Sequence, residues 1–349
     1  MNAIVIEKQG SPVTGNVKHR ADWAEIGEPP VGSVVVRALA SALNHMDLWV
    51  GRGVPGLELT YPRVSGCDAC GEVVAIGDGV DAGWLGKRVI VNAAVAIERP
   101  VRASDGVATH IAPEYELIGE HDPRGMHAER FIAPAANLAP VPDDCDPVAG
   151  AAYGLTALTA YSMMVTKGDL RPGQTVLITG IGGGVATIAM KLAKHLGCRV
   201  IVTSRHQHKL DRAIELGADE GVLDTGEDWS RAVRGLTAKR GVDMAVDSVG
   251  KAAHLPCIKS LARGGAYVTP GCTTGPDAVT DLARIFWNQL RVLGSTMGTA
   301  DEFREVASLF AADRVEPVVD SVFKPEQAQE AWARLEAGEQ MGKIVIDWR

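Results

Sequence analysis

The residues of this sequence with the most distinctive chemical spacing are Cys67 and Cys70, in the stretch SGCDACGEVV. A Cys-x-x-Cys spacing is typical of half a zinc site or of a redox-active dithiol. The whole sequence has six cysteines in 349 residues, and they are too scattered to predict a disulfide framework. A reducing compartment is therefore expected, and the cytoplasm is the predicted location.

A second candidate for chemistry is the glycine-rich stretch TVLITGIGGGVATIAMKLAKHLG. It predicts a buried strand, a tight turn and an amphipathic helix, which is the context in which glycines bind a dinucleotide. Gly180 is expected to make the turn, while Gly183 and Gly184 let the backbone approach a pyrophosphate. Val185 lies at the start of the helix whose free N–H groups would hold the phosphates. A glycine-rich turn in an unrelated α/β protein is the alternative.

The end of the next predicted strand indicates which cofactor is bound. In VIVTSRHQHKL, the strand leads into Ser204, Arg205 and Lys209, where a carboxylate would be expected for the ribose hydroxyls of NAD. A hydroxyl, a guanidinium and an ammonium group would instead pair with the 2′-phosphate of NADP. The sequence therefore favours NADPH over NADH, with solvated surface charges as the alternative.

The elements that must position these residues follow two patterns. Short Val- and Ile-rich runs between Gly and Pro turns predict a mainly β unit over roughly the first 130 residues. From about residue 150, strands alternate with amphipathic helices, which predicts an α/β unit with a parallel sheet covered on both faces. Val249 and Pro270 follow the last two of these strands, at the edge of the sheet where ligands bind.

Composition argues against several functional classes. The net charge of −8 provides no basic field for nucleic acid or an anionic membrane. No apolar run approaches the roughly 20 residues of a membrane helix, and the first residues do not have the pattern of a signal peptide. Charged residues make up 22% and apolar residues 46%, as in ordinary globular enzymes. We therefore predict an enzyme with a small-molecule substrate and no nucleic-acid or membrane partner.

Four stretches together resemble the medium-chain dehydrogenase/reductase superfamily: ALNHMDLWVGRG, YPRVSGCDACGEVVAIGDGV, LTALTAY and ITGIGGGVATIAMKLAKHLGCRVIVTS. The resemblance covers essentially the whole chain. It implies a GroES-like, mainly β catalytic domain over residues 1–150 and 294–349. A Rossmann domain with a doubly wound parallel sheet is expected over residues 151–293. It also implies a homodimer, paired through the strand in QLRVLGS, with a tetramer as the alternative.

The resemblance implies where the catalytic zinc of related alcohol dehydrogenases would lie. The three ligand positions match Asn44, Cys67 and Leu155, of which only Cys67 is a plausible ligand. The segment matching the structural-zinc lobe, residues 92–125, contains no cysteine. Both metals are therefore predicted to be absent, and an atypical site at Cys67 and Asp68 is the alternative.

Loss of the zinc bears on the reaction, because the metal makes alcohol oxidation feasible near neutral pH by polarising the hydroxyl. Hydride addition to a quinone or an α,β-unsaturated carbonyl does not need it. The resemblance thus implies a zinc-free NADPH-dependent reductase, similar to quinone oxidoreductases and enone reductases. The alternatives are an alcohol dehydrogenase or carbonyl reductase of the same fold, and a cofactor-binding protein with an RNA-binding or structural role. The negative charge argues against RNA.

On this interpretation the candidate catalytic residues are Asn44, His45, Asp47, Tyr61 and Cys67. Asn44 would hydrogen-bond a substrate oxygen or a ribose hydroxyl, or else cap a loop. His45 would contact the cofactor or relay a proton, Asp47 would act in catalysis or pin the loop, and Tyr61 would supply a proton or simply pack. Cys67 is expected to face the substrate, whereas Cys70 is interpreted as a packing residue.

Two further residues are candidate cofactor contacts by resemblance. Thr159 matches a family threonine beside the nicotinamide, and Lys343 lies in the returning GKIV stretch. A surface lysine is the alternative for Lys343.

Overall fold

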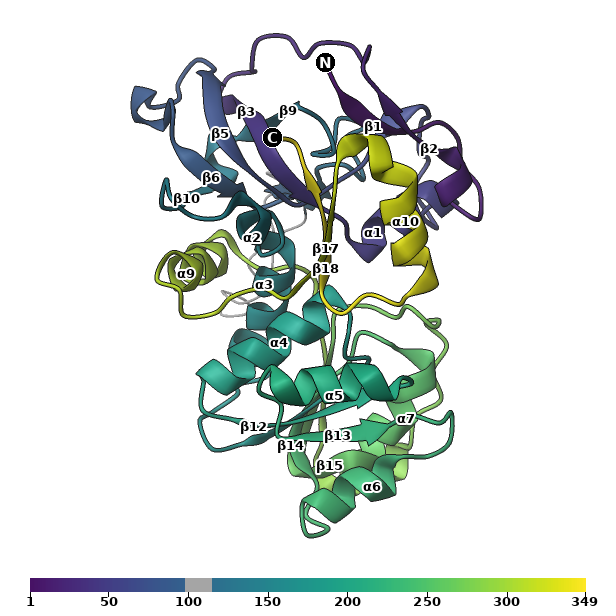
Figure 1. Cartoon of the computed structure of the whole chain (residues 1–349). Helices are drawn as coiled ribbons and strands as arrows, with labels where there is room; N and C mark the ends of the chain where they lie inside the picture. The colour runs from purple at the N-terminus through teal and green to yellow at the C-terminus, as the bar shows by residue number, and fades with distance from the viewer. Residues whose placement is uncertain (98–114) are drawn as a thin grey trace. The chain divides into compact units, whose positions relative to one another are not determined.

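The computed structural model describes residues 1–97 and 115–349. These residues form two compact units (Figure 1). The described part of the first unit is residues 1–97, 115–155 and 303–349, and that of the second is residues 156–302. The first unit is therefore assembled from segments that precede and follow the second in the sequence. The domain boundaries predicted at residues 150 and 294 stay a prediction.

The first unit is built around a largely antiparallel sheet whose longest strand is β3 (Ser33–Ala42). The strands run in the order β10-β6-β5-β3-β18-β17, and β9 also pairs with β3. β18 pairs Val345 with Ala42, so that Lys343 lies beside Asn44 just after β3. The other strands are β5 (Ala69–Ile76), β6 (Arg88–Val91), β9 (Arg130–Pro134), β10 (Leu138–Pro140), β17 (Val319–Phe323) and β18 (Lys343–Asp347).

Two smaller sheets and several short helices complete this unit. One sheet contains β1 (Ala3–Ile6), β2 (Val17–Arg20) and β4 (Arg63–Val64), and the other β7 (Ala94–Ala96) and β8 (Tyr115–Leu117). The helices are α1 (His45–Arg52), α2 (Pro147–Ala151) and α10 (Ala328–Ala337), with single turns at Thr14–Asn16, Ala82–Trp84, Ala135–Asn137 and Pro325–Gln327. α3 (Gly154–Tyr161) and α9 (Ala300–Ala311) span the points where the chain passes between the units.

The second unit contains a six-stranded parallel sheet in the order β13-β12-β11-β14-β15-β16. The strands are β11 (Thr175–Ile178), β12 (Arg199–Ser204), β13 (Glu220–Leu223), β14 (Val242–Val246), β15 (Leu261–Thr269) and β16 (Arg291–Gly294). The strand order reverses at β11, which pairs with β12 on one side and β14 on the other. This is the Rossmann arrangement, and ligands bind outside the carboxyl ends of the strands at such a reversal. The predicted α/β fold class is confirmed.

Helices cover both faces of this parallel sheet. α4 (Gly184–His195) and α5 (Gln207–Glu215) lie on one face, and α6 (Ser230–Leu236) and α7 (Lys251–Ser260) on the other (Figure 1). α8 (Leu282–Asn288) precedes β16, and a π-helical segment, Ser162–Lys167, follows α3. Among the described residues, no helix has the length and apolar character needed to span a bilayer.

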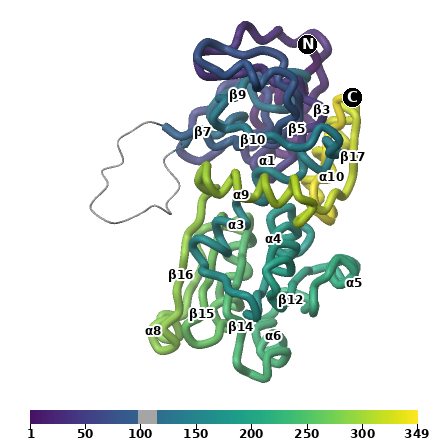
Figure 2. The backbone as a smooth tube through the Cα atoms, turned by 90° about the vertical axis from the view of Figure 1, so that its left-hand side faces the viewer, coloured from purple at the N-terminus to yellow at the C-terminus, as the bar shows by residue number. Residues whose placement is uncertain are grey.

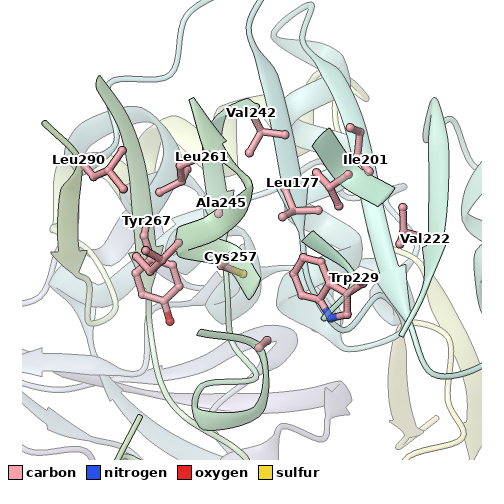
Figure 3. Packing of buried hydrophobic residues seen from close by; sticks show 13 residues of the cluster. Leu177, Ile201, Val222, Trp229, Val242, Ala245, Cys257, Leu261, Tyr267 and Leu290 are labelled. Carbon is pink, nitrogen blue, oxygen red and sulfur yellow. The ribbon is translucent and has the colours of Figure 1, made fainter. Parts of the chain in front are cut away.

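The face of the sheet that α6 and α7 cover has a continuous apolar core (Figure 3). Trp229 and Cys257 come from the helical side, and they pack with Leu177 and Ala245 of the central strands. Burying such side chains contributes on the order of 1.5–3 kcal/mol each. This core fixes the parallel register that brings the strand ends to one edge.

Candidate active site

A buried ionic cluster lies at the end of β3 in the first unit. Lys343 Nζ donates to Asp68 Oδ2 at 2.9 Å and to Asn44 Oδ1 at 2.5 Å. Asn44 Nδ2 donates to the same Asp68 oxygen at 2.9 Å, so three residues close a ring of hydrogen bonds. Asp68 Oδ1 accepts the backbone N–H of Leu155 at 2.8 Å.

All three side chains of the cluster are almost completely removed from solvent. Asn44 is 7% exposed, Asp68 1% and Lys343 3%. A charge buried to this degree needs a partner of opposite sign and further hydrogen bonds. Asp68 and Lys343 supply the charges, and Asn44 satisfies both. The surface lysine considered for Lys343 is therefore wrong.

Cys67 lies beside this cluster without joining its charges. It has no exposed area, and its Sγ lies 3.4 Å from Asn44 Nδ2. Burial, together with the carboxylates of Asp47 and Asp68, raises the pKa of the Cys67 thiol well above its usual value. In these surroundings the thiol form of Cys67 is favoured over the thiolate, which is the form that acts as a nucleophile.

The residues of the cluster do not fit a catalytic zinc. Such a zinc needs three protein ligands and an open fourth position. Of the three matching positions, Leu155 offers only a backbone N–H, and Asn44 Oδ1 already accepts from the Lys343 ammonium. Within residues 1–97 and 115–349, no three His, Cys, Asp or Glu side chains are grouped so that they could hold a metal ion. A zinc at this place would also meet the positive charge of Lys343.

Asp47 is placed in a second buried network rather than in the ionic cluster. Its Oδ2 accepts the backbone N–H of Asn44 at 2.7 Å, which fixes the start of α1. Its Oδ1 lies 3.4 Å from His127 Nε2, and His127 Nδ1 lies 2.9 Å from Ser41 Oγ. Burial opposes ionisation of Asp47, yet the nearby His127 ring and the backbone N–H of Asn44 hold its pKa below the usual value. This geometry supports the loop-pinning role.

His45 and Tyr61 stand apart from both networks. His45 is exposed at the first position of α1, where its ring meets Trp49 edge-on at 5.5 Å. The hydroxyl of Tyr61 donates to the backbone carbonyl of Val50, so it ties this loop to α1. The geometry therefore gives the packing interpretation of Tyr61 more support than that of a proton donor.

The glycine turn of the second unit connects β11 to α4. Gly180 has a φ of +62°, a left-handed conformation that glycine adopts without strain. Gly183 instead has a φ of −72° as the residue before α4, a value open to any residue. A side chain at Gly183 would find its nearest described atom 3.9 Å away, so space lies open in front of this backbone. Gly184 and Val185 form the first turn of α4, whose N–H groups suit a phosphate.

The three residues predicted to recognise a 2′-phosphate lie at the end of β12 and in the helix that follows. Ser204 is 5% exposed, and its Oγ accepts the backbone N–H of His206 at 3.1 Å. Arg205 is exposed, whereas Lys209 is 5% exposed within α5. Lys209 is therefore not a solvated surface charge, although Arg205 is free to meet a ligand.

Asp247 joins the ends of the strands that precede Val249 and Pro270. This residue was not identified from the sequence. This carboxylate accepts from Thr179 Oγ1 at 2.5 Å and from Tyr267 at 2.7 Å. It also accepts the backbone N–H groups of Val249 at 2.9 Å and Gly250 at 3.2 Å. The ends of β11, β14 and β15 are thus tied at the strand-order reversal. Burial, followed by the Asp247 charge, raises the pKa of Tyr267 far above its usual value.

Thr159 and Pro270 complete the predicted cofactor contacts. Thr159 is 5% exposed on α3, with Oγ1 3.9 Å from the sulfur of Met297. Pro270 directly follows β15 and is partly exposed. Their roles, like those of the other predicted site residues, stay predictions.

Comparisons with known proteins agree with this architecture. Residues 30–143 match the alcohol dehydrogenase GroES-like domain, and residues 184–312 match the zinc-binding dehydrogenase family. A solved structure described as an NAD-dependent alcohol dehydrogenase is 36% identical, with a TM-score of 0.90 and full coverage of both chains. The chain belongs to the medium-chain dehydrogenase/reductase superfamily.

Two curated members of this superfamily show the range of its reactions. A zinc-type alcohol dehydrogenase-like protein, YogA, of Leptosphaeria maculans is 29% identical, covering 95% of this chain and 96% of the relative. A crotonyl-CoA carboxylase/reductase of Cereibacter sphaeroides is 26% identical, covering 96% of this chain and 82% of the relative. The superfamily is nicotinamide-dependent, and this chain is one of its oxidoreductases.

Proposed function

We propose that this medium-chain oxidoreductase transfers hydride from NADPH to a quinone or an α,β-unsaturated carbonyl without zinc. The observation that carries the proposal is the buried cluster of Asn44, Asp68 and Lys343. The three positions that match a catalytic zinc site offer one plausible metal ligand, Cys67, and the Lys343 ammonium group is held beside another of them, Asn44.

The ammonium of Lys343 gives this cluster an electrophile of its own. Two of its three protons reach Asp68 and Asn44, which leaves one donor among the described contacts. A donor held in a buried site stabilises negative charge that develops on a substrate oxygen. Asp68 pairs with the lysine, and Asn44 orients it. Asp68 and Asn44 thus act as positioning residues for Lys343.

This chemistry suits an acceptor that is already electrophilic. NADPH, when bound, supplies the hydride. Its addition to an enone or quinone places negative charge on the carbonyl oxygen, where a lysine proton stabilises it. Alcohol oxidation is less well served, because an ammonium proton donor does not help a hydroxyl to lose its proton.

The choice of NADPH rests on Ser204, Arg205 and Lys209. A basic residue that is exposed beside a buried hydroxyl at the end of β12 offers a site for a 2′-phosphate. The crotonyl-CoA carboxylase/reductase relative acts, by its name, on an activated alkene, which supports the proposed acceptor class.

NADPH oxidation against quinones, enones, enals and aldehydes, with NADH as the control cofactor, tests the proposal. We expect turnover of quinones or enones with NADPH, no loss of activity after chelation, and substoichiometric zinc in the purified protein. Stoichiometric zinc together with chelator-sensitive activity would overturn the zinc-free reaction. A strong preference for NADH would overturn the interpretation of Arg205.

A second candidate is an alcohol dehydrogenase or carbonyl reductase, because the 36% identical structure is described as an NAD-dependent alcohol dehydrogenase. The same experiment separates the two. Oxidation of alcohols with NAD, without turnover of enones or quinones, would favour this second candidate.

We also propose a cytoplasmic homodimer that pairs through the second unit. β16 is an edge strand of the parallel sheet, and α8 lies close to it in the sequence and in Figure 2. Leu282, Phe286 and Trp287 of α8 are 71%, 69% and 73% exposed, so apolar surface accompanies an open strand edge. Light scattering should give a dimer for the unaltered protein and a monomer for Trp287→Glu. A monomeric unaltered protein would exclude this assembly.

A further inference from the structure

A chain of polar contacts in the first unit begins at Trp348, which follows β18, and leads to the ionic cluster. Trp348 Nε1 donates to Ser41 Oγ at 2.9 Å, and Ser41 Oγ lies 2.9 Å from His127 Nδ1. His127 Nε2 lies 3.4 Å from Asp47 Oδ1. The other Asp47 oxygen accepts the backbone N–H of Asn44 at 2.7 Å. Three fully buried side chains therefore connect Trp348 to a residue of the ionic cluster.

The direction of these contacts indicates which nitrogen of His127 carries its proton. An indole N–H can only donate, so the Ser41 oxygen accepts from Trp348, and the Ser41 hydroxyl proton can be donated to His127 Nδ1. The proton of a neutral His127 then lies on Nε2, which faces the Asp47 carboxylate. With the proton on Nδ1 instead, the lone pair of Nε2 would face that carboxylate. The surroundings therefore favour the Nε2–H tautomer.

The ring of His127 is closely packed between its neighbours. Trp332 meets it edge-on at 5.1 Å, and a side-chain carbon at Gly66 would lie 2.7 Å from His127 Cδ2. Among the described residues, neither His127 Nε2 nor Asp47 Oδ1 has a hydrogen-bond partner. Their 3.4 Å separation is longer than an ordinary hydrogen bond. Because both atoms are buried, the attraction between an N–H group and a carboxylate is still strong at this distance.

Ser41, His127 and Asp47 are the residue types of a hydrolytic triad. None of the three has any exposed area, so the Ser41 hydroxyl cannot attack a substrate. Ser41 instead accepts the indole N–H of Trp348, which fixes its orientation. The three residues are therefore arranged to orient one another.

We propose that His127 is held as the Nε2–H tautomer and acts, through Asp47, as a positioning residue for Asn44. The Nε2–H group fixes one oxygen of Asp47, so that the other oxygen stays directed at the backbone N–H of Asn44. The Asn44 side chain in turn binds Lys343 and Asp68. His127 itself contacts neither substrate nor cofactor, and no proton is transferred along the chain.

The first test is 15N NMR of the full-length protein with labelled histidine. The protein has nine histidines, and the ring signals that are absent from His127→Gln identify His127. We expect a protonated Nε2 and an unprotonated Nδ1 near pH 7, because the two kinds of ring nitrogen have well separated shifts. A ring that is mainly protonated on Nδ1, or on both nitrogens, would overturn the proposal. This measurement uses the unaltered protein and does not depend on the stability of a variant.

The second test follows the backbone amide of Asn44 by NMR. His127→Leu removes both ring nitrogens, so we expect the Asn44 amide proton to change its shift and to exchange with solvent roughly tenfold faster. His127→Gln, whose side-chain amide can present an N–H group near the position of Nε2, should retain most of the original signal. NADPH-dependent turnover should fall roughly tenfold in His127→Leu and less in His127→Gln. The turnover measurement alone rests on the proposed function.

His254→Leu is the matched control, because His254 is 9% exposed and meets the ring of Tyr267 edge-on at 4.7 Å. It should lower the stability without changing the Asn44 amide. An unchanged Asn44 amide in His127→Leu, or an equal change in the control, would overturn the positioning role. If the unaltered protein reduces no acceptor, the proposed function fails, and the NMR measurements still decide the role of His127.

Discussion

The ionic cluster of the first unit and the glycine turn of the second unit differ in how much room surrounds them. In the cluster, the chain's own side chains bind one another, apart from one remaining donor of Lys343: Lys343 binds Asp68 and Asn44, and none of the three is more than 7% exposed. In the turn, a side-chain carbon at Gly183 would find its nearest described atom 3.9 Å away. The cluster is therefore largely closed on itself, whereas space lies open beside the turn.

Because of this difference, we expect substitutions in the two regions to change different properties of the protein. Changes in a closed buried cluster act first on folding, because each lost partner leaves an unsatisfied group. Changes in an open turn act first on cofactor affinity. Variants in the two regions can therefore separate stability from binding.

The largest effect is expected for Lys343→Met, which leaves Asp68 buried without its counter-ion. Removing one partner of a buried pair costs about 3–5 kcal/mol of the free energy of unfolding. Urea unfolding should show this loss, and the double variant Lys343→Met/Asp68→Leu should recover a large part of it.

Lys324→Met is the matched control, because Lys324 pairs with Asp347 at 3.1 Å but is 52% exposed. An exposed pair contributes only about 0–1 kcal/mol. Equal losses for Lys343→Met and the control would remove the basis for calling the cluster closed.

A slightly smaller effect is expected at a second closed contact of the first unit, around Glu336. This carboxylate accepts the backbone N–H groups of Val13 and Thr14 at 3.0 Å each, the Thr14 hydroxyl at 2.6 Å, and Arg52 at 3.0 Å. Burial opposes its ionisation, but these bonds lower its pKa from 4.5 to about 2.

Because the folded pKa of Glu336 is depressed, its contribution is complete above about pH 4.5 and is lost as the pH falls towards 2. A shift of this size corresponds to roughly 3 kcal/mol. Glu336→Gln should therefore reduce the stability at pH 7 and flatten its fall on acidification. Glu330→Gln, at an exposed position of α10, should change neither. If the stability of Glu336→Gln fell on acidification as steeply as that of the unaltered protein, Glu336 would not be the source of this pH dependence.

The glycine turn offers a contrast within one loop. Gly183→Ala keeps an ordinary backbone conformation and open space, so the unfolding midpoint should stay unchanged while NADPH affinity falls roughly 10- to 100-fold. Gly180→Ala should instead lower stability, because its φ is +62° and its side chain would meet Val249 at 2.8 Å. Thermal unfolding and NADPH fluorescence titration measure both. Unaltered NADPH affinity in Gly183→Ala would show that the open space is not a phosphate site.

The smallest effect is expected for Arg205→Ala. Loss of one charge-assisted hydrogen bond to a 2′-phosphate should weaken NADPH binding roughly tenfold and leave NADH binding unchanged. Arg212→Ala is the matched control, because this exposed arginine of α5 already pairs with Glu215 at 2.8 Å. Equal losses for NADPH and NADH in Arg205→Ala would argue against recognition of the 2′-phosphate.

The contrast also explains what could be predicted from the sequence. The glycine turn was predictable, because strand, turn and helix are consecutive and each has its own local pattern. The loss of zinc ligands was inferred from residue types at Asn44, Cys67 and Leu155. The fold class followed from the same local patterns and from the family resemblance.

The ionic cluster was not predictable, because its two charges are 275 residues apart and meet only through the pairing of β18 with β3. A lysine that begins an apolar strand, as in KIVI, was the only local signal. Asp47 and His127 were missed as partners for the same reason. Cys70 was interpreted as a packing residue, and the structure buries it completely on β5.

The late position of β18 has a consequence for the chain while it is being made. Asp68 leaves the ribosome 275 residues before the lysine that will neutralise it. At about 5–20 residues per second, this delay is roughly 14–55 s. During that time the end of β3 lacks β18, one of its two neighbouring strands, and Asp68 lacks its counter-ion. The first unit must therefore wait for the second to be synthesised, and a nascent chain stalled before residue 343 should keep this sheet edge open to chaperones.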